Sequence, residues 1–236
     1  MRNSFEHITL KASVLSLSLL FLAYPAQSQE SSASLIEEII VTAQRTEESL
    51  QDVPIAVTAL TSSMLEDMQI EGGSDLQLVT PSLSFQGSDA TGGAFNIRGI
   101  TNLAVSPTAE SGVEIHVNDM PVGATTMQDG DFLDMERIEV LRGPQGTLFG
   151  KNSVGGVINL ITAKPQFGQT LGSMTLEKGS YDLVKTKMMF NMPIGDSLAL
   201  RIAGASNDRD GDIKNIYSKA KTSHVNNRDS DAYRLS

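Results

Sequence analysis

A glycine-rich stretch with one lysine, Gly143–Gly156, is the first place where phosphate chemistry could be expected. A phosphate-binding loop has the pattern G-x-x-x-x-G-K-[ST], because its lysine and hydroxyl must reach the phosphates and magnesium. Here Gly150-Lys151 is followed by Asn152, and the glycine before them, Gly146, is one residue too close. The dinucleotide pattern G-x-G-x-x-G also fails. We interpret the stretch as a loop that needs positive φ angles and close packing.

Histidine and cysteine usage gives no metal or catalytic site. His7 lies near the N-terminus, His116 in a β-prone run and His224 in a polar loop, and none has a second histidine or a cysteine at ligand spacing. We expect His116 to be an exposed strand residue. The chain has no cysteine, which excludes disulfides and thiolate sites, and no nucleophile-elbow serine. We expect no cofactor, no metal and no enzymatic activity.

The N-terminus has the three parts of a secretory signal. Arg2 and Lys11 supply its positive charge, Val14–Leu22 is apolar, and Ala26-Gln27-Ser28 is a small-x-small cleavage site. The alternative, a buried N-terminal helix, does not explain this order. We expect a signal peptide over residues 1–28 and export through the Sec route.

The charge of the chain excludes one class of partner. The formal net charge is −10, and removal of residues 1–28 with Arg2, Lys11 and Glu6 changes it to −11. Nucleic-acid phosphates need a basic surface, so we expect no nucleic acid to bind. An exported chain without cysteine is typical of a Gram-negative periplasm or outer membrane.

A short β-prone run, residues 36–43, interrupts a polar leader. It could be the first strand of the domain that follows, or an extended peptide offered to the sheet edge of a partner. The residues leave both interpretations open.

A compact region with alternating strands and short helices follows. Val53–Leu60 reads as a strand, a capping box at Ser63 and Glu66 predicts a helix that begins near Met64 and stops at Gly72-Gly73, and Asp134–Arg137 reads as a helical turn. Asp75–Val79 reads as a second short helical turn, ended by Thr80-Pro81. Five further strands are expected: Phe95–Gly99, Val113–Val117, Met120–Val122, Ile138–Leu141 and Val157–Ile161.

After Lys164-Pro165 the pattern changes to long alternating segments. Val184, Met188 and Phe190 alternate with Lys185 and Lys187. Segments of about ten residues with one apolar and one polar face are what a transmembrane barrel strand needs. A soluble antiparallel sheet with one wet face has the same alternation, so the pattern alone leaves both interpretations open.

Five segments, in order, resemble the TonB-dependent outer-membrane receptor family. They are EEIIVTAQR (Glu37–Arg45), DVPIAVTAL (Asp52–Leu60), FNIRGI (Phe95–Ile100), VEIHVNDMPVG (Val113–Gly123) and MERIEVLRGPQGTLFGKNSVGGVINLITAKP (Met135–Pro165). The resemblance implies an α+β plug domain, a small mixed sheet with short helices, followed by the start of an antiparallel transmembrane β-barrel. In this family the plug sits inside a barrel of about 22 strands.

The resemblance divides the chain into four parts: signal peptide 1–28, linker 29–51 with a TonB box at about 37–45, plug 52–165, and three or four barrel strands in 166–236. It implies that TonB binds Ile39, Ile40, Val41, Thr42 and Ala43 as a strand. It also implies that ExbB and ExbD in the inner membrane power TonB. Four strands cannot close a barrel, so we expect either part of a longer gene product or a truncated one.

Three charged residues match family positions where the plug meets the barrel. They are Arg98 in the IRG motif, and Glu139 and Arg142 around LRGP. The resemblance implies that they hold the plug at rest and are not substrate ligands; the alternative is an ordinary surface charge.

The function expected from the resemblance is energy-coupled uptake of a scarce, bulky ligand at the outer membrane of a Gram-negative cell. A ferric siderophore is the first expectation, with cobalamin, haem or an oligosaccharide as alternatives. A free plug-like periplasmic binding module is a second class. The ligand-binding residues are unknown, with Gly87–Gly93 and Leu103–Ser111 as the plug segments to consider.

Overall fold

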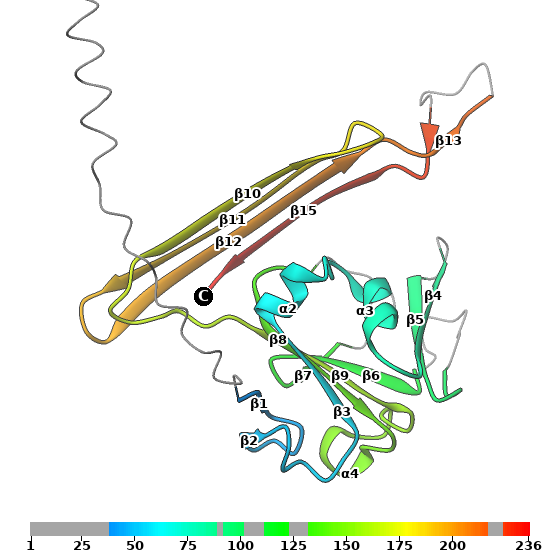
Figure 1. Cartoon of the computed structure of the whole chain (residues 1–236), viewed down its shortest axis with the longest axis vertical. Helices are drawn as coiled ribbons and strands as arrows, with labels where there is room; N and C mark the ends of the chain where they lie inside the picture. Colours follow the sequence, from blue (N-terminus) through cyan, green and yellow to red (C-terminus); the bar gives the residue numbers. More distant parts are fainter. Residues whose placement is uncertain (1–37, 89–91, 102–110, 123–131, 217–223) are drawn as a thin grey trace, which may run out of the picture. The chain divides into compact units, whose positions relative to one another are not determined.

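The computed structural model describes residues 38–88, 92–101, 111–122, 132–216 and 224–236 (Figure 1). The predicted signal peptide and most of the candidate ligand segment Leu103–Ser111 lie outside these residues. Among the helices within these ranges, none is both long and apolar enough to cross a membrane.

A mixed five-stranded sheet forms the centre of the first domain, with strand order β3-β8-β9-β6-β7. Its strands pair antiparallel, except β6 and β9, which run parallel. The five strands are β3 (Val57–Thr61), β6 (Val113–Val117), β7 (Met120–Pro121), β8 (Met135–Arg142) and β9 (Gly156–Thr162). Asn118 and Asp119 both take positive φ, as the β6–β7 turn requires. The mixed sheet expected from the resemblance is confirmed.

Two local predictions were wrong. Asp134–Arg137 is not a helical turn, because Met135–Arg137 already belongs to β8, where Arg137 pairs with Thr61 of β3 and Ile161 of β9. The first strand starts at Val57 rather than Val53. Pro54 has no amide hydrogen to donate to a ladder, which favours this later start.

Two short helices lie where the sequence predicted them, with different caps, and a third lies in the glycine-rich stretch that we interpreted as a loop. Helix α2 (Ser62–Asp67) begins after Thr61, whose hydroxyl accepts from the Met64 amide, so Thr61 and not Ser63 is the N-cap. The helix also ends before Gly72, which instead caps the 3-10 helix η2 (Gly73–Asp75). Helix α3 (Leu76–Val79) and helix α4 (Gly146–Phe149) are single turns.

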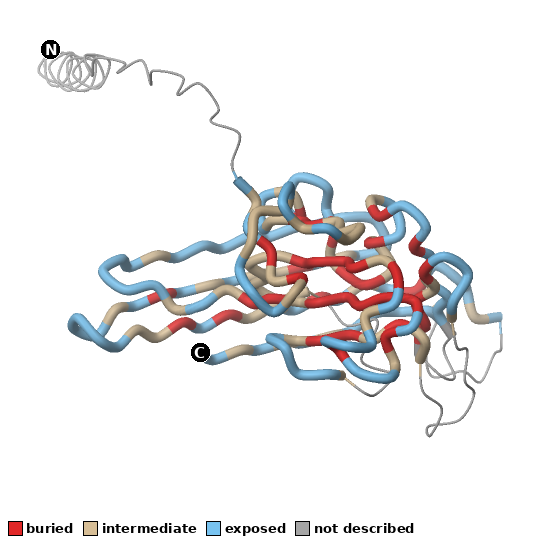
Figure 2. Tube along the Cα trace, turned by 90° about the horizontal axis from the view of Figure 1, so that it is seen from below, coloured by how far each residue is buried: buried red, intermediate tan, exposed pale blue. Residues whose placement is uncertain are grey.

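The two faces of the five-stranded sheet differ in character. One face packs a wholly apolar core with α2, α3 and the hairpin β4 (Leu83–Ser88) and β5 (Gly92–Ile97). Its central residues are Phe95, Ile97, Ile138, Val140 and Ile158. Buried residues gather in these strands (Figure 2). The opposite face has a smaller apolar cluster around Leu141, Phe149 and Val157, and it also carries buried polar side chains.

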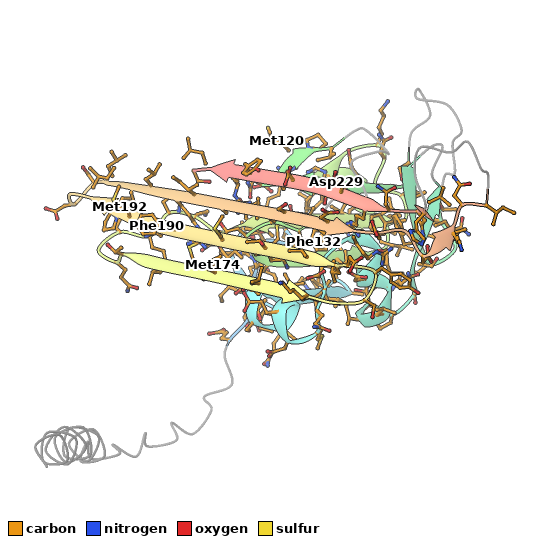
Figure 3. All side chains as sticks on the ribbon, turned by 90° about the horizontal axis from the view of Figure 1, so that it is seen from above. Met120, Phe132, Met174, Phe190, Met192 and Asp229 are labelled. Atoms are coloured by element: carbon orange, nitrogen blue, oxygen red, sulfur yellow. The ribbon has the colours of Figure 1, made fainter. Side chains whose placement is uncertain are left out.

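Four long strands form a separate antiparallel sheet in the order β10-β11-β12-β15 (Figure 1). They are β10 (Leu171–Lys178), β11 (Val184–Ile194), β12 (Leu198–Arg209) and β15 (Arg228–Leu235). A two-residue pair, β13 (Ile213–Lys214) and β14 (His224–Val225), lies between β12 and β15 along the chain. The predicted alternation is confirmed: Lys185 and Asn191 are buried, whereas Met174, Phe190 and Met192 are exposed (Figure 3).

Gly156 at the start of β9 should be indispensable for the sheet. A Cβ atom there would lie 2.3 Å from the Leu141 carbonyl oxygen, and the residue has φ +153°. We expect Gly156→Ala to lower the free energy of unfolding by roughly 1–3 kcal/mol through overpacking, measured by urea titration. Gly146→Ala is the matched control, because nothing lies within 4 Å of its Cβ position. Equal stability of the two variants would contradict this account.

Candidate functional site

The predicted TonB box lies on the polar face of the domain as part of a small hairpin. Strand β1 (Ile40–Val41) pairs with β2 (Glu48–Ser49), and the Leu50 amide donates to the Ile39 carbonyl at 2.8 Å. The run that looked isolated in the sequence therefore pairs with a strand of its own linker. It does so because its apolar side chains can be buried here: Val41 and Ala43 are fully buried against Leu141, Phe149 and Val157.

Polar contacts fix the middle of this segment. The Thr42 amide donates to Oε1 of Glu139 at 2.8 Å, and the Thr42 hydroxyl lies 3.2 and 3.3 Å from the two carboxylate oxygens. Arg45 follows, with Nε donating to the Leu148 carbonyl at 2.8 Å and its guanidinium 5.0 Å from the centre of the Phe149 ring. Ile40 points outward and remains 41% exposed.

Glu139 lies in the middle of strand β8 and contacts Thr42. It is completely buried within the domain, and its hydrogen-bond partners are Thr42 and Arg137. On β8 its side chain faces away from the apolar core and toward residues 39–45. Among the described residues, Glu139 is thus hydrogen-bonded to the N-terminal segment and to its own strand, and its role at a plug–barrel interface stays a prediction.

Arg98 directly follows β5, and Arg142 is the last residue of β8. Arg98 is exposed, has φ +54° and donates its amide to the Ser82 carbonyl. Arg142 is half-buried at the end of β8, and its amide donates to the Ala56 carbonyl. Their role at a plug–barrel interface stays a prediction.

A pair of acidic residues that the sequence reasoning missed joins the two sheets. Asp134 accepts from Nε of Arg201 and from Nη2 of Arg234, each at 2.8 Å. Glu71 forms an ion pair with Lys185 and a second one with Lys187, whose Nζ lies 3.1 Å from Oε1 of Glu71. The four basic residues share one face of β11, β12 and β15, as the registers Asn191–Arg201 and Ala203–Arg234 require. The basic side chains on the predicted polar face were the available signal, because such charges need partners when buried.

The electrostatics of these carboxyl groups follow from their partners. Burial alone would raise the pKa of Asp134, but the hydrogen bonds and charges of Arg201 and Arg234 outweigh it, so the pKa lies below its usual range. For Glu71 the balance is the same: burial opposes ionisation, and Lys185 and Lys187 lower the pKa. Both groups are therefore held as carboxylates near neutral pH.

His116 is 1% exposed, so the expectation of an exposed strand residue was wrong. Its ring packs edge-on against Phe149 at 5.2 Å, and Nδ1 lies 3.2 Å from the Asp119 carbonyl. Helix α4 therefore covers this position, which sequence alternation cannot reveal. In the part of the chain that the structure describes, no cluster of histidine, aspartate and glutamate could hold a metal.

A cavity of about 280 Å³ lies beside the hairpin. Its lining includes Thr42 and Glu47 from the hairpin, Arg137 from β8, and Thr162 and Lys164 at the end of β9. It is thus part of the same site, next to the Thr42–Glu139 contact.

A small mixed-sheet domain, ion-paired to the polar face of long strands whose other face is apolar, defines a class of protein. An outer-membrane barrel with a plugged lumen has this construction, since its strands alternate between lipid and interior.

Comparison with known proteins identifies the family. The family model described as TonB-dependent Receptor Plug Domain matches residues 49–157. The iron-regulated outer membrane virulence protein of Vibrio cholerae is 28% identical over 186 residues, 75% of this chain and 28% of that protein. The vitamin B12 transporter of Photobacterium profundum is 26% identical over 72% of this chain and 28% of its own length.

A solved structure agrees. The ferric yersiniabactin uptake receptor of Yersinia pestis matches with a TM-score of 0.62 and 26% identity, over 77% of this chain and 27% of that receptor. Residues 49–157 are therefore the plug domain of a TonB-dependent outer-membrane receptor, and the strands that follow match the early barrel of such receptors. The chain spans between a quarter and three tenths of the length of these relatives.

Loss of the Asp134 carboxylate should weaken the attachment of the plug to the strands. In Asp134→Asn, Arg201 and Arg234 keep their charges in places where 8% and 20% of their side chains are exposed. We expect the free energy of unfolding, measured by urea titration, to fall by about 3–5 kcal/mol, the range for breaking a buried pair from one side. Asp229→Asn, on the exposed outer face of β15 (Figure 3), is the control and should change it by less than about 0.5 kcal/mol. Similar losses in both would contradict the assignment.

Acid should weaken the same attachment. A carboxyl group whose pKa is lowered on folding stabilises the fold above its unfolded pKa, and this contribution disappears as the pH falls through the lower folded pKa. With unfolded values of about 3.9 for Asp and 4.3 for Glu, stability from Asp134 and Glu71 should be constant at neutral pH and decline below about pH 4. The unfolding temperature, followed against pH, should decline less steeply there in Asp134→Asn; parallel curves would refute the linkage.

Proposed function

We propose that the receptor takes up a scarce, bulky ligand across the outer membrane of a Gram-negative cell by TonB-coupled transport. The observation that carries the proposal is the plug domain ion-paired to the polar face of barrel-type strands. A free plug-like module would have no use for the apolar outer face formed by residues such as Met174, Met188 and Phe190, which are 47–69% exposed.

Energy enters the proposed cycle through residues 39–43. The outer membrane has no ATP, so the work must come from the inner-membrane gradient, where each charge moved yields ~2.3 kcal/mol per 100 mV. TonB, powered by ExbB and ExbD, pairs a strand with Ile39–Ala43 and pulls, since strand addition supplies backbone hydrogen bonds that share the load. Two features support this: β1 has a single strand partner among the described residues, and Ile40 is exposed beside it.

The outer membrane is the proposed location. In this arrangement the short turn Gly195–Ser197 between β11 and β12 is periplasmic, and the longer connection from β12 to β15 is extracellular. The acidic residues Asp208 and Asp229 lie opposite each other in the register of β12 and β15, and in this arrangement they are at the extracellular rim. They are thereby clear of the lipid that surrounds Phe190 and Met192.

A ferric siderophore is the proposed cargo. Support comes from relatives named for ferric yersiniabactin uptake and for iron regulation. A second candidate is cobalamin, which the name of the Photobacterium profundum relative favours. Haem or an oligosaccharide would use the same mechanism. Uptake of radiolabelled iron–siderophore and of cobalamin by cells carrying the full-length receptor separates these cargoes.

Blocking strand formation at residue 40 tests the coupling. Ile40→Pro in the full-length receptor removes a backbone donor at an exposed side chain, so the buried contacts of Val41 and Ala43 are spared. We expect uptake to be abolished and ligand binding to cells to persist. Ile40→Val, which keeps the donor, is the matched control and should transport normally. Normal uptake by Ile40→Pro would sink the coupling proposal.

A further inference from the structure

Glu139 is a charged group in the interior of the domain, and residues 39–45 supply part of its solvation. It has no exposed surface, so water cannot hydrate the carboxylate. Oε1 accepts from Nε of Arg137 at 2.8 Å and from the Thr42 amide at 2.8 Å, and the Thr42 hydroxyl reaches both oxygens. A buried carboxylate needs such donors, because an unsatisfied charge in a protein interior is costly.

Within the sheet, Arg137 is the residue whose side chain donates to Glu139 among the described residues. Glu139 lies in register with Ala59 on one neighbouring strand and with Asn159 on the other. The Ala59 side chain offers no donor, and among the described atoms the Asn159 side-chain amide donates no hydrogen bond to Glu139. Arg137 is therefore the cation of the domain that contacts Glu139, and it is shared with Glu136.

We propose that Glu139 is an intramolecular binding site for residues 39–43, and that it withholds the Thr42 amide from any partner strand. Docking of residues 39–43 is inferred from the contacts of Thr42, Val41 and Ala43 alone, whereas its consequence for TonB binding rests on the proposed function. The site recognises a backbone amide and a hydroxyl through a fixed carboxylate, while Val41 and Ala43 fill the apolar cluster on either side.

Docking and capture by a partner then compete for the same atoms. A strand that pairs along Ile39–Ala43 needs these backbone amides, and the Thr42 amide is already donated to a carboxylate. Charge-assisted hydrogen bonds are about twice as strong as neutral ones. Removing the charge of Glu139 should therefore raise the undocked fraction of the segment while the apolar contacts remain.

Thiol labelling measures docking without any partner. The chain contains no cysteine, so a single Val41→Cys substitution in the full-length receptor reports on one buried position. Val41 is 0% exposed, and a maleimide can reach a thiol there only when the segment leaves the plug. Ile40→Cys, at the exposed neighbouring position, is the reporter control and should label rapidly in every background.

Glu139→Gln and Glu136→Gln form the matched pair of variants. Both remove a carboxylate that contacts Arg137, but Glu136 is 42% exposed in its side chain and does not touch Thr42. We expect Glu139→Gln to speed labelling at position 41 by roughly tenfold, which corresponds to about 1.4 kcal/mol. Glu136→Gln should leave the rate unchanged. Equal rates in both variants and the parent overturn the proposal.

Thr42→Val covers the case in which Glu139→Gln does not fold. This change lies outside the plug sheet and removes only the hydroxyl donor, so the Thr42 amide bond stays. We expect labelling at position 41 to rise several-fold, as for loss of one hydrogen bond. An unchanged rate counts against the site.

Binding of the purified TonB C-terminal domain separates the two proposals. If both hold, Glu139→Gln binds it roughly tenfold more tightly than the parent. Faster labelling without TonB binding in any variant supports the docking site and refutes the proposed role of residues 39–43. Tighter TonB binding at an unchanged labelling rate refutes the docking site alone.

Discussion

Two plug carboxylates, Asp134 and Glu71, oppose four basic side chains on one face of the long strands, and the relation between the domains depends on these ion pairs. Charges removed from water need partners at close range, and a missing partner costs more than the pair gains. The registers of β11, β12 and β15 bring the basic residues to one face, and the Ala163 amide, which donates to the Asp134 carbonyl, ties that residue to the end of β9. The plug must therefore be folded before the attachment can form.

The two faces of the plug sheet have different tasks because their residues differ. The face with Ile138, Val140 and Ile158 is covered by helices and the β4–β5 hairpin in a dry core. The other face presents Glu139, Asn159 and His116 in one cross-strand row, all nearly inaccessible to water. An apolar helix would leave this row unsatisfied. The hairpin of β1 and β2 covers its Glu139 end with an amide and a hydroxyl, so the N-terminal segment is attached by polar bonds that another strand could replace.

Periodicity predicted the long strands well, because a strand with lipid on one side and charge on the other repeats strictly every second residue. It was less reliable in the plug. Met135–Arg137 resembled a helical turn because its charged residues show no alternation, yet pairing with β3 and β9 makes it a strand. His116 was expected at the surface, but helix α4, which lies far along the chain, covers it. Alternation within one strand cannot reveal such a cover. Glu71 and Asp134 gave no local signal, because their basic partners lie 67 or more positions away in the sequence. The motif resemblance located residues 39–43, whereas their docking partner became visible only in three dimensions.

Strand β8 connects the two attachments. Asp134 precedes it, Glu139 lies at its middle and Arg142 ends it, and it is paired on both sides along most of its length. Under the proposed pull on residues 39–43, the load meets the Thr42–Glu139 bonds before it reaches β8. Those bonds are few, while β8 is held by two ladders and, through Asp134, by Arg201 and Arg234. Hydrogen bonds contribute on the order of 1 kcal/mol each, so the segment should separate from the plug while β8 and the ion pairs remain. The position of Glu139 on a strand held by two ladders thus makes release of the segment the first step and leaves the attachment to the barrel in place.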